Sequence, residues 1–177
     1  MNEALREGRS IIDFLDTIRA AAYDAPFFSG RGSLRMRLTG MGLRLVSPYR
    51  PEITIMSWPG TYISIGLSAY LDDTPKNKRL LEFFIDITPK PNGGFTVASY
   101  VFMDVLAPSE NQICVQKFPS RFVDNLTDLG DALAESAKEL AAWSEDVVAK
   151  ARHIAANEKA FLSDYEEGEG SGEDGTN

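Results

Sequence analysis

Residues 62–106 hold three stretches in which apolar side chains recur at every second position: YISIGLSAYL (62–71), LLEFFIDIT (80–88) and FTVASYVFMDVL (95–106). This period is typical of β-strands, because successive side chains along a strand point to opposite faces of the sheet. The link before the third stretch contains Pro91-Asn92-Gly93-Gly94, a strong hairpin signal. Because short links favour antiparallel pairing, the sequence predicts an antiparallel meander.

Shorter strands are predicted on both sides of this meander, giving about five to six strands in all. Residues 52–58 precede it across a turn at Pro59-Gly60, and residues 112–118 form a weaker last strand. Residues 34–45 alternate leucine and methionine with arginine around Gly40-Met41, which fits a two-residue turn. We interpret residues 34–45 as a hairpin, with a bulge at Gly40 as the alternative.

Two segments with apolar residues at helical spacing precede and follow the strands. Residues 2–22 show it until Asp24-Ala25-Pro26, where proline disfavours helix in the preceding residue. Residues 126–162 show it again, with a break allowed near Gly130 or at Ala156-Asn157. An unbroken helix over most of this range would be on the order of 50 Å long, longer than a small sheet is wide, so part of it would project or meet a partner.

The length and charge of the chain fit one domain followed by an acidic tail. The 177 residues carry a net charge of −8, and six of the acids lie in residues 164–177, which contain glycine, serine and little that is apolar. We expect a single α+β domain over residues 1–163 and a disordered tail over residues 164–177. The start of the chain lacks a signal-peptide pattern and Cys114 is the single cysteine, so a cytoplasmic location is expected.

Alternation assigns the strand residues to two faces of the sheet. One face is a continuous apolar layer that a helix must cover. The residues on this face are Ile63, Ile65, Leu67, Ala69, Leu71, Leu81, Phe83, Ile85, Ile87, Phe95, Val97, Val101, Met103 and Val105. The long C-terminal helix has a matching apolar stripe. We therefore expect this helix to pack on the apolar face.

The opposite face mixes aromatic rings with small residues and carboxylates. Its residues are Met56, Trp58, Tyr62, Ser64, Gly66, Ser68, Tyr70, Glu82, Phe84, Asp86, Thr96, Ala98, Tyr100, Phe102 and Asp104. Aromatic side chains and methionine are enriched in the cores of protein interfaces, and small side chains allow another chain or a ligand to approach the strand. Three interpretations remain open: coverage by the N-terminal helix, a protein interface, or a small-molecule pocket.

Residues capable of chemistry are few. The single histidine, His153, lies in a helical stretch among charged residues, and Cys114 lies between apolar strand residues, which favours structural roles for both. The mixed face also carries three acids, Glu82, Asp86 and Asp104. Paired carboxylates can act as general acid and base, so a carboxylate-based enzyme is a weaker alternative. No metal-ligand set or cofactor motif is present, so no catalytic residue, metal or cofactor is assigned.

Five arginines form the main basic concentration against the overall charge: Arg31, Arg35, Arg37, Arg44 and Arg50. With Tyr49 nearby they would suit a phosphate, an acidic protein or the chain's own tail, and the alternative is a charged, solvated edge strand. Nucleic-acid binding is disfavoured because the anionic helix and tail would oppose it.

The functional hypothesis is a non-enzymatic protein-binding module: an inhibitor, an immunity protein or a chaperone-like adaptor. Its order of elements is similar to that of small secretion chaperones, immunity proteins and helix-grip lipid carriers, a similarity of architecture that assigns no residues. We expect the partner to be another protein, or a second copy of this chain, and not a membrane. The alternative is a carrier that holds a small apolar ligand between the sheet and the long helix.

The binding residues predicted under this hypothesis all come from the mixed face except one. The aromatic anchors are Trp58, Tyr62, Tyr70, Phe84, Tyr100 and Phe102, and the charged residues that orient the partner at the rim are Glu82, Asp86 and Arg37.

Overall fold

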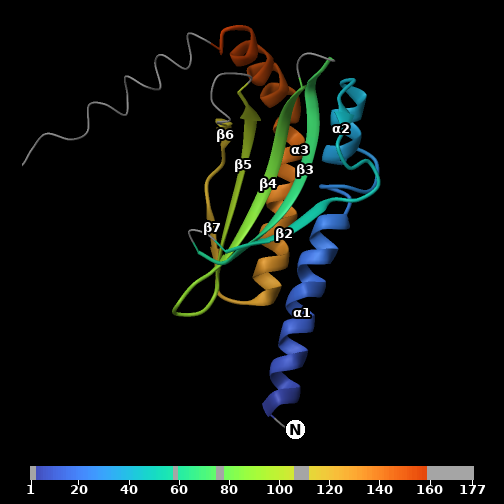
Figure 1. The fold of residues 1–177 in the computed structure, drawn as a ribbon. Helices are drawn as coiled ribbons and strands as arrows, with labels where there is room; N and C mark the ends of the chain where they lie inside the picture. The colour runs from blue at the N-terminus through green and yellow to red at the C-terminus, as the bar shows by residue number, and fades with distance from the viewer. Residues whose placement is uncertain (1–2, 58–59, 75–77, 106–111, 159–177) are drawn as a thin grey trace, which may run out of the picture.

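The computed structural model describes residues 3–57, 60–74, 78–105 and 112–158, with the side chains of residues 3–5 and 7 left out. An N-terminal helix, a short second helix, an open antiparallel sheet and a long C-terminal helix follow one another along the chain (Figure 1). This arrangement confirms the predicted α+β class with the long helix packed on the sheet. The predicted tail over residues 164–177 lies outside the described residues.

Among the described residues the sheet has seven strands, all paired antiparallel. They are β1 (Arg44–Leu45), β2 (Glu52–Met56), β3 (Tyr62–Asp73), β4 (Lys78–Pro89), β5 (Phe95–Asp104), β6 (Gln112–Lys117) and β7 (Arg121–Val123). The long strands β3, β4 and β5 are adjacent, in the order of the predicted meander. At one edge β1 and β2 both pair with β3, and at the other β6 and β7 both pair with β5.

The hairpin between β4 and β5 turns on the predicted glycines. The amide of Lys90 donates to the carbonyl of Gly94 at 3.0 Å, and Gly93 and Gly94 have φ values of +92° and +77°. Gly94 also packs closely against β7, because a Cβ there would be 2.3 Å from the carbonyl oxygen of Val123. Only glycine fits this position without moving the backbone.

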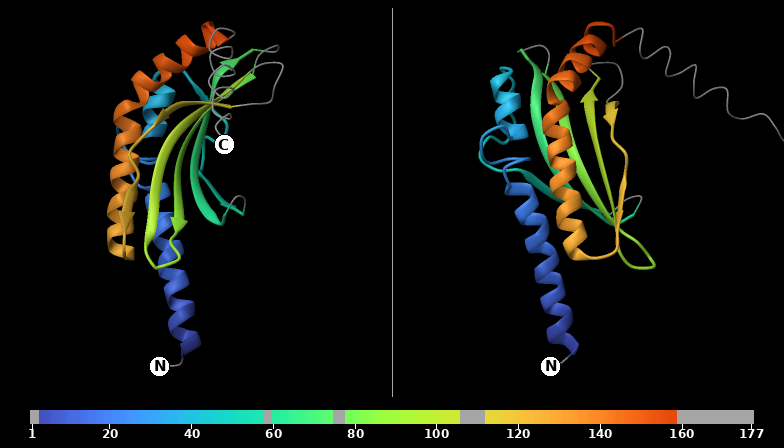
Figure 2. Two further views of the ribbon diagram at one scale, coloured as in Figure 1. Left: turned by 90° about the vertical axis from the view of Figure 1, so that its left-hand side faces the viewer. Right: turned by 180° about the vertical axis from the view of Figure 1, so that it is seen from behind.

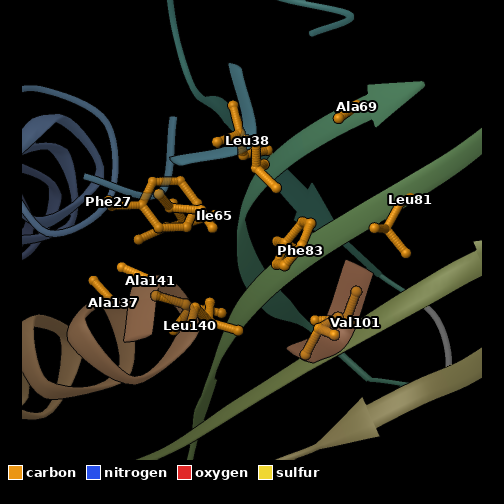
Figure 3. Packing of buried hydrophobic residues seen from close by; sticks show 14 of the residues in the cluster. Phe27, Leu38, Ile65, Ala69, Leu81, Phe83, Val101, Ala137, Leu140 and Ala141 are labelled. Atoms are coloured by element: carbon orange, nitrogen blue, oxygen red, sulfur yellow. The ribbon is translucent and has the colours of Figure 1, made fainter. Parts of the chain in front are cut away.

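The core lies between the sheet and the helix α3 (Leu126–Ala156). Figure 2 shows α3 and the short helix α2 (Leu34–Gly40) on one side of the sheet. The predicted apolar face points into this layer, where Phe83, Ile65 and Val101 are fully enclosed and meet Leu140 of α3 (Figure 3). The assignment of residues to faces that alternation predicted for the three long strands is therefore the observed one.

Helix α3 is continuous, without the break that Gly130 allowed. It begins at the cap Asn125, whose side chain accepts a hydrogen bond from the amide of Asp128 at 2.9 Å, and it is capped at its end by Asn157. Its 31 residues make it roughly 46 Å long. Gly130 lies where α3 meets the first helix, and a Cβ there would be 3.7 Å from Cγ2 of Thr17, an ordinary contact distance.

Helix α1 (Glu3–Tyr23) packs beside α3 and projects past the sheet (Figure 1). Ile18 and Ala22 are buried, and the ring of Phe14 stacks on that of Phe95 at 5.3 Å. Earlier in the helix, Ile11 and Ile12 are about 60% exposed. The alternative in which this helix covers the mixed face of the sheet is therefore wrong.

The hairpin predicted for residues 34–45 is also wrong, because residues 34–40 form α2 and β1 begins only at Arg44. Ser33 caps the helix through its hydroxyl, which accepts from the amide of Met36 at 3.4 Å. Leu34 and Leu38 are both fully buried. Leucines four residues apart fit a helix as well as a strand, and five alternating residues are too few to separate the two periods.

Strand β7 is the element that the sequence did not indicate. Its three residues follow Pro119 and pair with the start of β5. Arg121 ties the strand to α3, because its guanidinium donates to the hydroxyl of Ser136 at 3.1 Å and to the carboxylate of Glu139 at 3.0 Å. A three-residue strand has too little alternation to be recognised by period.

Candidate binding site on the sheet face opposite α3

The side of the sheet opposite α3 carries the mixed face, and the strand register arranges its residues in rows. One row joins Gly66 on β3, Phe84 on β4 and Tyr100 on β5. The neighbouring row joins Ser68, Glu82 and Phe102. No helix lies over this face in the described part of the chain (Figure 2).

A pocket of about 350 Å³, open to solvent, lies on this face. Its lining residues come from five strands: Glu52, Thr54, Met56, Tyr62, Ser64, Gly66, Phe84, Tyr100, Phe102 and Gln112. Four of the six predicted aromatic anchors therefore line one concave surface.

Three rings in contact form one side of the pocket. The centroids of Phe84 and Tyr100 are 6.0 Å apart, and those of Tyr100 and Phe102 are 5.1 Å apart at an angle of 66°. The ring of Phe84 lies against Gly66, where a Cβ would be 3.0 Å from its Cε1. The glycine therefore lets this ring lie close to β3, which deepens the pocket.

Carboxylates stand next to the rings at one end of the pocket. The side-chain amide of Gln112 donates to Glu82 and to Asp104, the latter at 3.1 Å. Burial raises the pKa of Glu82, the charges of Asp104 and Glu52 add to the rise, and the hydrogen bond from Gln112 opposes it. Glu82 therefore carries its charge at a cost in the free protein.

Asp86 is the most enclosed acid of this face, at 9% exposure. It lies in register with Ser64, which lines the pocket, and its Oδ1 has no hydrogen-bond partner among the described residues. Burial raises the pKa of Asp86, and the Ser64 hydroxyl opposes this only in part. A buried carboxylate without full hydrogen bonding is costly to ionise.

The other predicted site residues that the structure describes are not among the lining residues of the pocket. Tyr70 is on the same face, but the guanidinium of Arg44 covers its ring at 4.2 Å. Arg37 is on α2, 3.9 Å from Glu145 of α3, so its assignment to the rim of the mixed face is wrong. Trp58 lies outside the described residues.

The predicted arginine patch is divided between local contacts. Arg35 donates to the carbonyl of Phe28 at 2.9 Å, and Arg37 donates to that of Gly32 at 3.1 Å. Arg44 forms an ion pair with Asp73 at 2.6 Å. These three arginines are therefore largely engaged in fastening α2 and β1, and a joint anion site is not formed by them.

Neither the histidine nor the cysteine is among the residues that line this pocket. His153 is exposed on α3, and Cys114 is half-buried on β6 opposite Phe102. Within the described ranges no three or more His, Cys, Asp or Glu side chains are placed to hold a metal ion. None of the described helices combines the length and apolar character that crossing a membrane requires.

Sequence reasoning missed three lining residues, Glu52, Thr54 and Gln112. Glu52 and Thr54 are four and two residues before Met56 on β2, so alternation places all three side chains on the same face. Gln112 could not be placed in this way. Its position depends on a register shift between β5 and β6 after Val101, which local pattern does not reveal.

Comparison of the chain with protein-family models, curated proteins and solved structures found no match. Because a fold class by itself does not specify an activity, the chemistry of the pocket and its surroundings is what indicates a function.

Proposed function

We propose that this chain is a non-enzymatic protein-binding module, an inhibitor, immunity protein or chaperone-like adaptor, that holds its partner on the sheet face opposite α3. The observation that carries the proposal is the aromatic pocket on a face that no described helix covers. Rings held by a rigid sheet supply contact area at low entropic cost, which is why tyrosine and tryptophan dominate binding hot spots.

The edge strand β2 favours a protein over a small ligand as the partner. Met56 lines the pocket and is 39% exposed, whereas Ile55 is 69% exposed on the opposite side of the strand, in register with Ile63. Strand β2 pairs only with β3 in the described part of the sheet, so its outer edge offers backbone groups to a partner. A partner segment laid along β2 would reach the pocket rings.

The alternative of a carrier needs a cavity between the sheet and α3. In that layer the side chains of Ile65, Phe83 and Leu140 are 0–1% exposed and fill the space between the elements (Figure 3). The described pocket lies on the other face. Its position therefore supports the binding module over the carrier.

The test is partner capture by a variant that removes two rings, Tyr100→Ala/Phe102→Ala. We expect affinity purification from native-host lysate to lose specific partners that the wild-type chain captures. The control is Trp143→Ala, which removes an exposed aromatic side chain from α3 on the other layer. Thermal unfolding of each variant establishes that the fold persists. Equal recovery of the same partners by the double variant and the wild type would refute the proposed face.

A further inference from the structure

The pocket of the proposed binding face combines aromatic rings with negative charge. Glu52 lines it, and the acids Glu82, Asp86 and Asp104 share its sheet face. Neither lysine nor arginine is among the residues that line it. The basic residue that pairs with a lining residue is Lys117, which lies opposite Tyr100 on the edge strand β6.

Rings and carboxylates together bind a cation more strongly than either does alone. The face of an aromatic ring attracts a cation within about 6 Å of its centroid, and a carboxylate supplies the opposite charge. A guanidinium suits such a site better than an ammonium, because its planar fork stacks on rings and donates two parallel hydrogen bonds to a carboxylate.

The protein already binds one of its own arginines in this way on the same sheet. Arg44 lies over the ring of Tyr70 at 4.2 Å and donates to the carboxylate of Asp73 at 2.6 Å. In the pocket the rings and the acids are present, but no cationic side chain of the described lining fills the corresponding place.

We propose that the pocket receives an arginine side chain of the partner protein, stacked on the Phe84 and Tyr100 rings with its charge met by Glu52 and Glu82. This inference rests on the proposed function and specifies the partner residue that the pocket selects. The pocket volume of about 350 Å³ is near the lower end of the roughly 300–1,000 Å³ of small-molecule sites, which fits one long side chain.

The state of the buried acids supports a site that lacks a positive counter-charge in the free protein. Burial raises the pKa of both Glu82 and Asp86 in the free protein, and Asp86 keeps an oxygen without a hydrogen-bond partner in the described structure. A guanidinium in the pocket would interact favourably with both carboxylates. The bound state would then recover electrostatic energy that the free protein lacks.

The experiment compares two capped pentapeptides, Gly-Gly-Arg-Gly-Gly and the same peptide with citrulline, which keeps the shape of arginine without its charge. Each is titrated into the full chain while the amide resonances of Gly66 and Tyr100 are followed by nuclear magnetic resonance. We expect the arginine peptide to bind roughly three- to tenfold more tightly than the citrulline peptide, as expected for a partly desolvated cation–π contact with a carboxylate nearby.

A pair of matched variants locates the charge that is responsible. Glu52→Gln/Glu82→Gln removes two charges at the pocket, and we expect it to bring the two peptide affinities close together. Asp131→Asn/Asp146→Asn removes two charges from exposed positions on α3 and should leave the preference for arginine intact.

Three results would overturn the arginine assignment: equal affinity of the wild-type chain for both peptides, no movement of the two resonances at ten-millimolar peptide (on the order of the weakest useful affinity), or tighter binding of a lysine peptide. If partner capture still depends on Tyr100 and Phe102 in that case, the binding face stands and only its choice of arginine fails.

Discussion

At the scale of single residues, Asp86 shows how the mixed face costs stability. Burial raises its pKa, so the folded protein holds the proton to a higher pH than the unfolded chain does. The wild type therefore loses stability as the pH rises from the ordinary aspartate value of 3.8 through the raised value. The carboxylate is fully charged and its cost complete above that interval.

Asp86→Asn should remove this cost and raise the free energy of unfolding at pH 7 by on the order of 1 kcal/mol. The gain should shrink as the pH falls toward 4, because the wild-type carboxylate then takes up its proton. Urea unfolding at several pH values measures both effects. Asp146→Asn, at an exposed position on α3, is the control and should show no such gain. A variant that is less stable than the wild type at pH 7 would mean that the charge of Asp86 is well satisfied.

Substitution of two adjacent glycines, Gly93 and Gly94, distinguishes the energetic cost of backbone strain from the cost of a steric clash. Gly93→Ala places a Cβ in open space at φ +92°, whereas Gly94→Ala places one 2.3 Å from the Val123 carbonyl at φ +77°. We expect a cost of roughly 1–2 kcal/mol for Gly93→Ala from the left-handed conformation alone. Gly94→Ala should cost distinctly more, because β7 must also move. Thermal unfolding of the two variants compares them, and similar losses would show that β7 adapts freely.

At the scale of elements, a buried arginine fastens the end of α3 to the β3–β4 hairpin. Arg79 is 3% exposed and contacts Asp72 at 3.3 Å and Glu158 at 2.7 Å. Arg79→Ala should lower the free energy of unfolding by roughly 3 kcal/mol, because it leaves the two acids without their shared partner. Arg44→Ala breaks an exposed pair instead and should cost less. Equal losses in urea unfolding would contradict the role of burial.

Pattern length explains which elements the sequence could predict. Strands β3, β4 and β5 run for ten to twelve residues, and their alternation assigned faces correctly from Ile63 to Met103. Helix α2 has seven residues, and its leucine spacing was equally consistent with a strand. The aromatic rings of the pocket were predictable from parity, whereas Gln112 depended on a bulge and Arg37 on an element type that was wrong.

At the scale of the whole molecule, α3 and α2 cover one sheet face, no described helix covers the other, and the first part of α1 projects past the sheet (Figure 1). Ile18 of α1 is 1% exposed, whereas Ile12 is 59% exposed. Apolar contacts, and with them local stability, should therefore concentrate in the central strands and α3, and decrease toward β2 and the first half of α1.

Amide hydrogen exchange of the free protein should follow this gradient. We expect the slowest exchange in β4, β5 and α3, where opening requires disruption of the core, and fast exchange in β2 and in α1 before Phe14. Adding the captured partner should slow exchange in β2 and β3, which border the pocket, and leave the first half of α1 unchanged. Amide protection of Ile11 and Ile12 in the free protein equal to that of α3 would contradict this gradient. Such protection would indicate that a second copy of the chain covers the projecting part of α1.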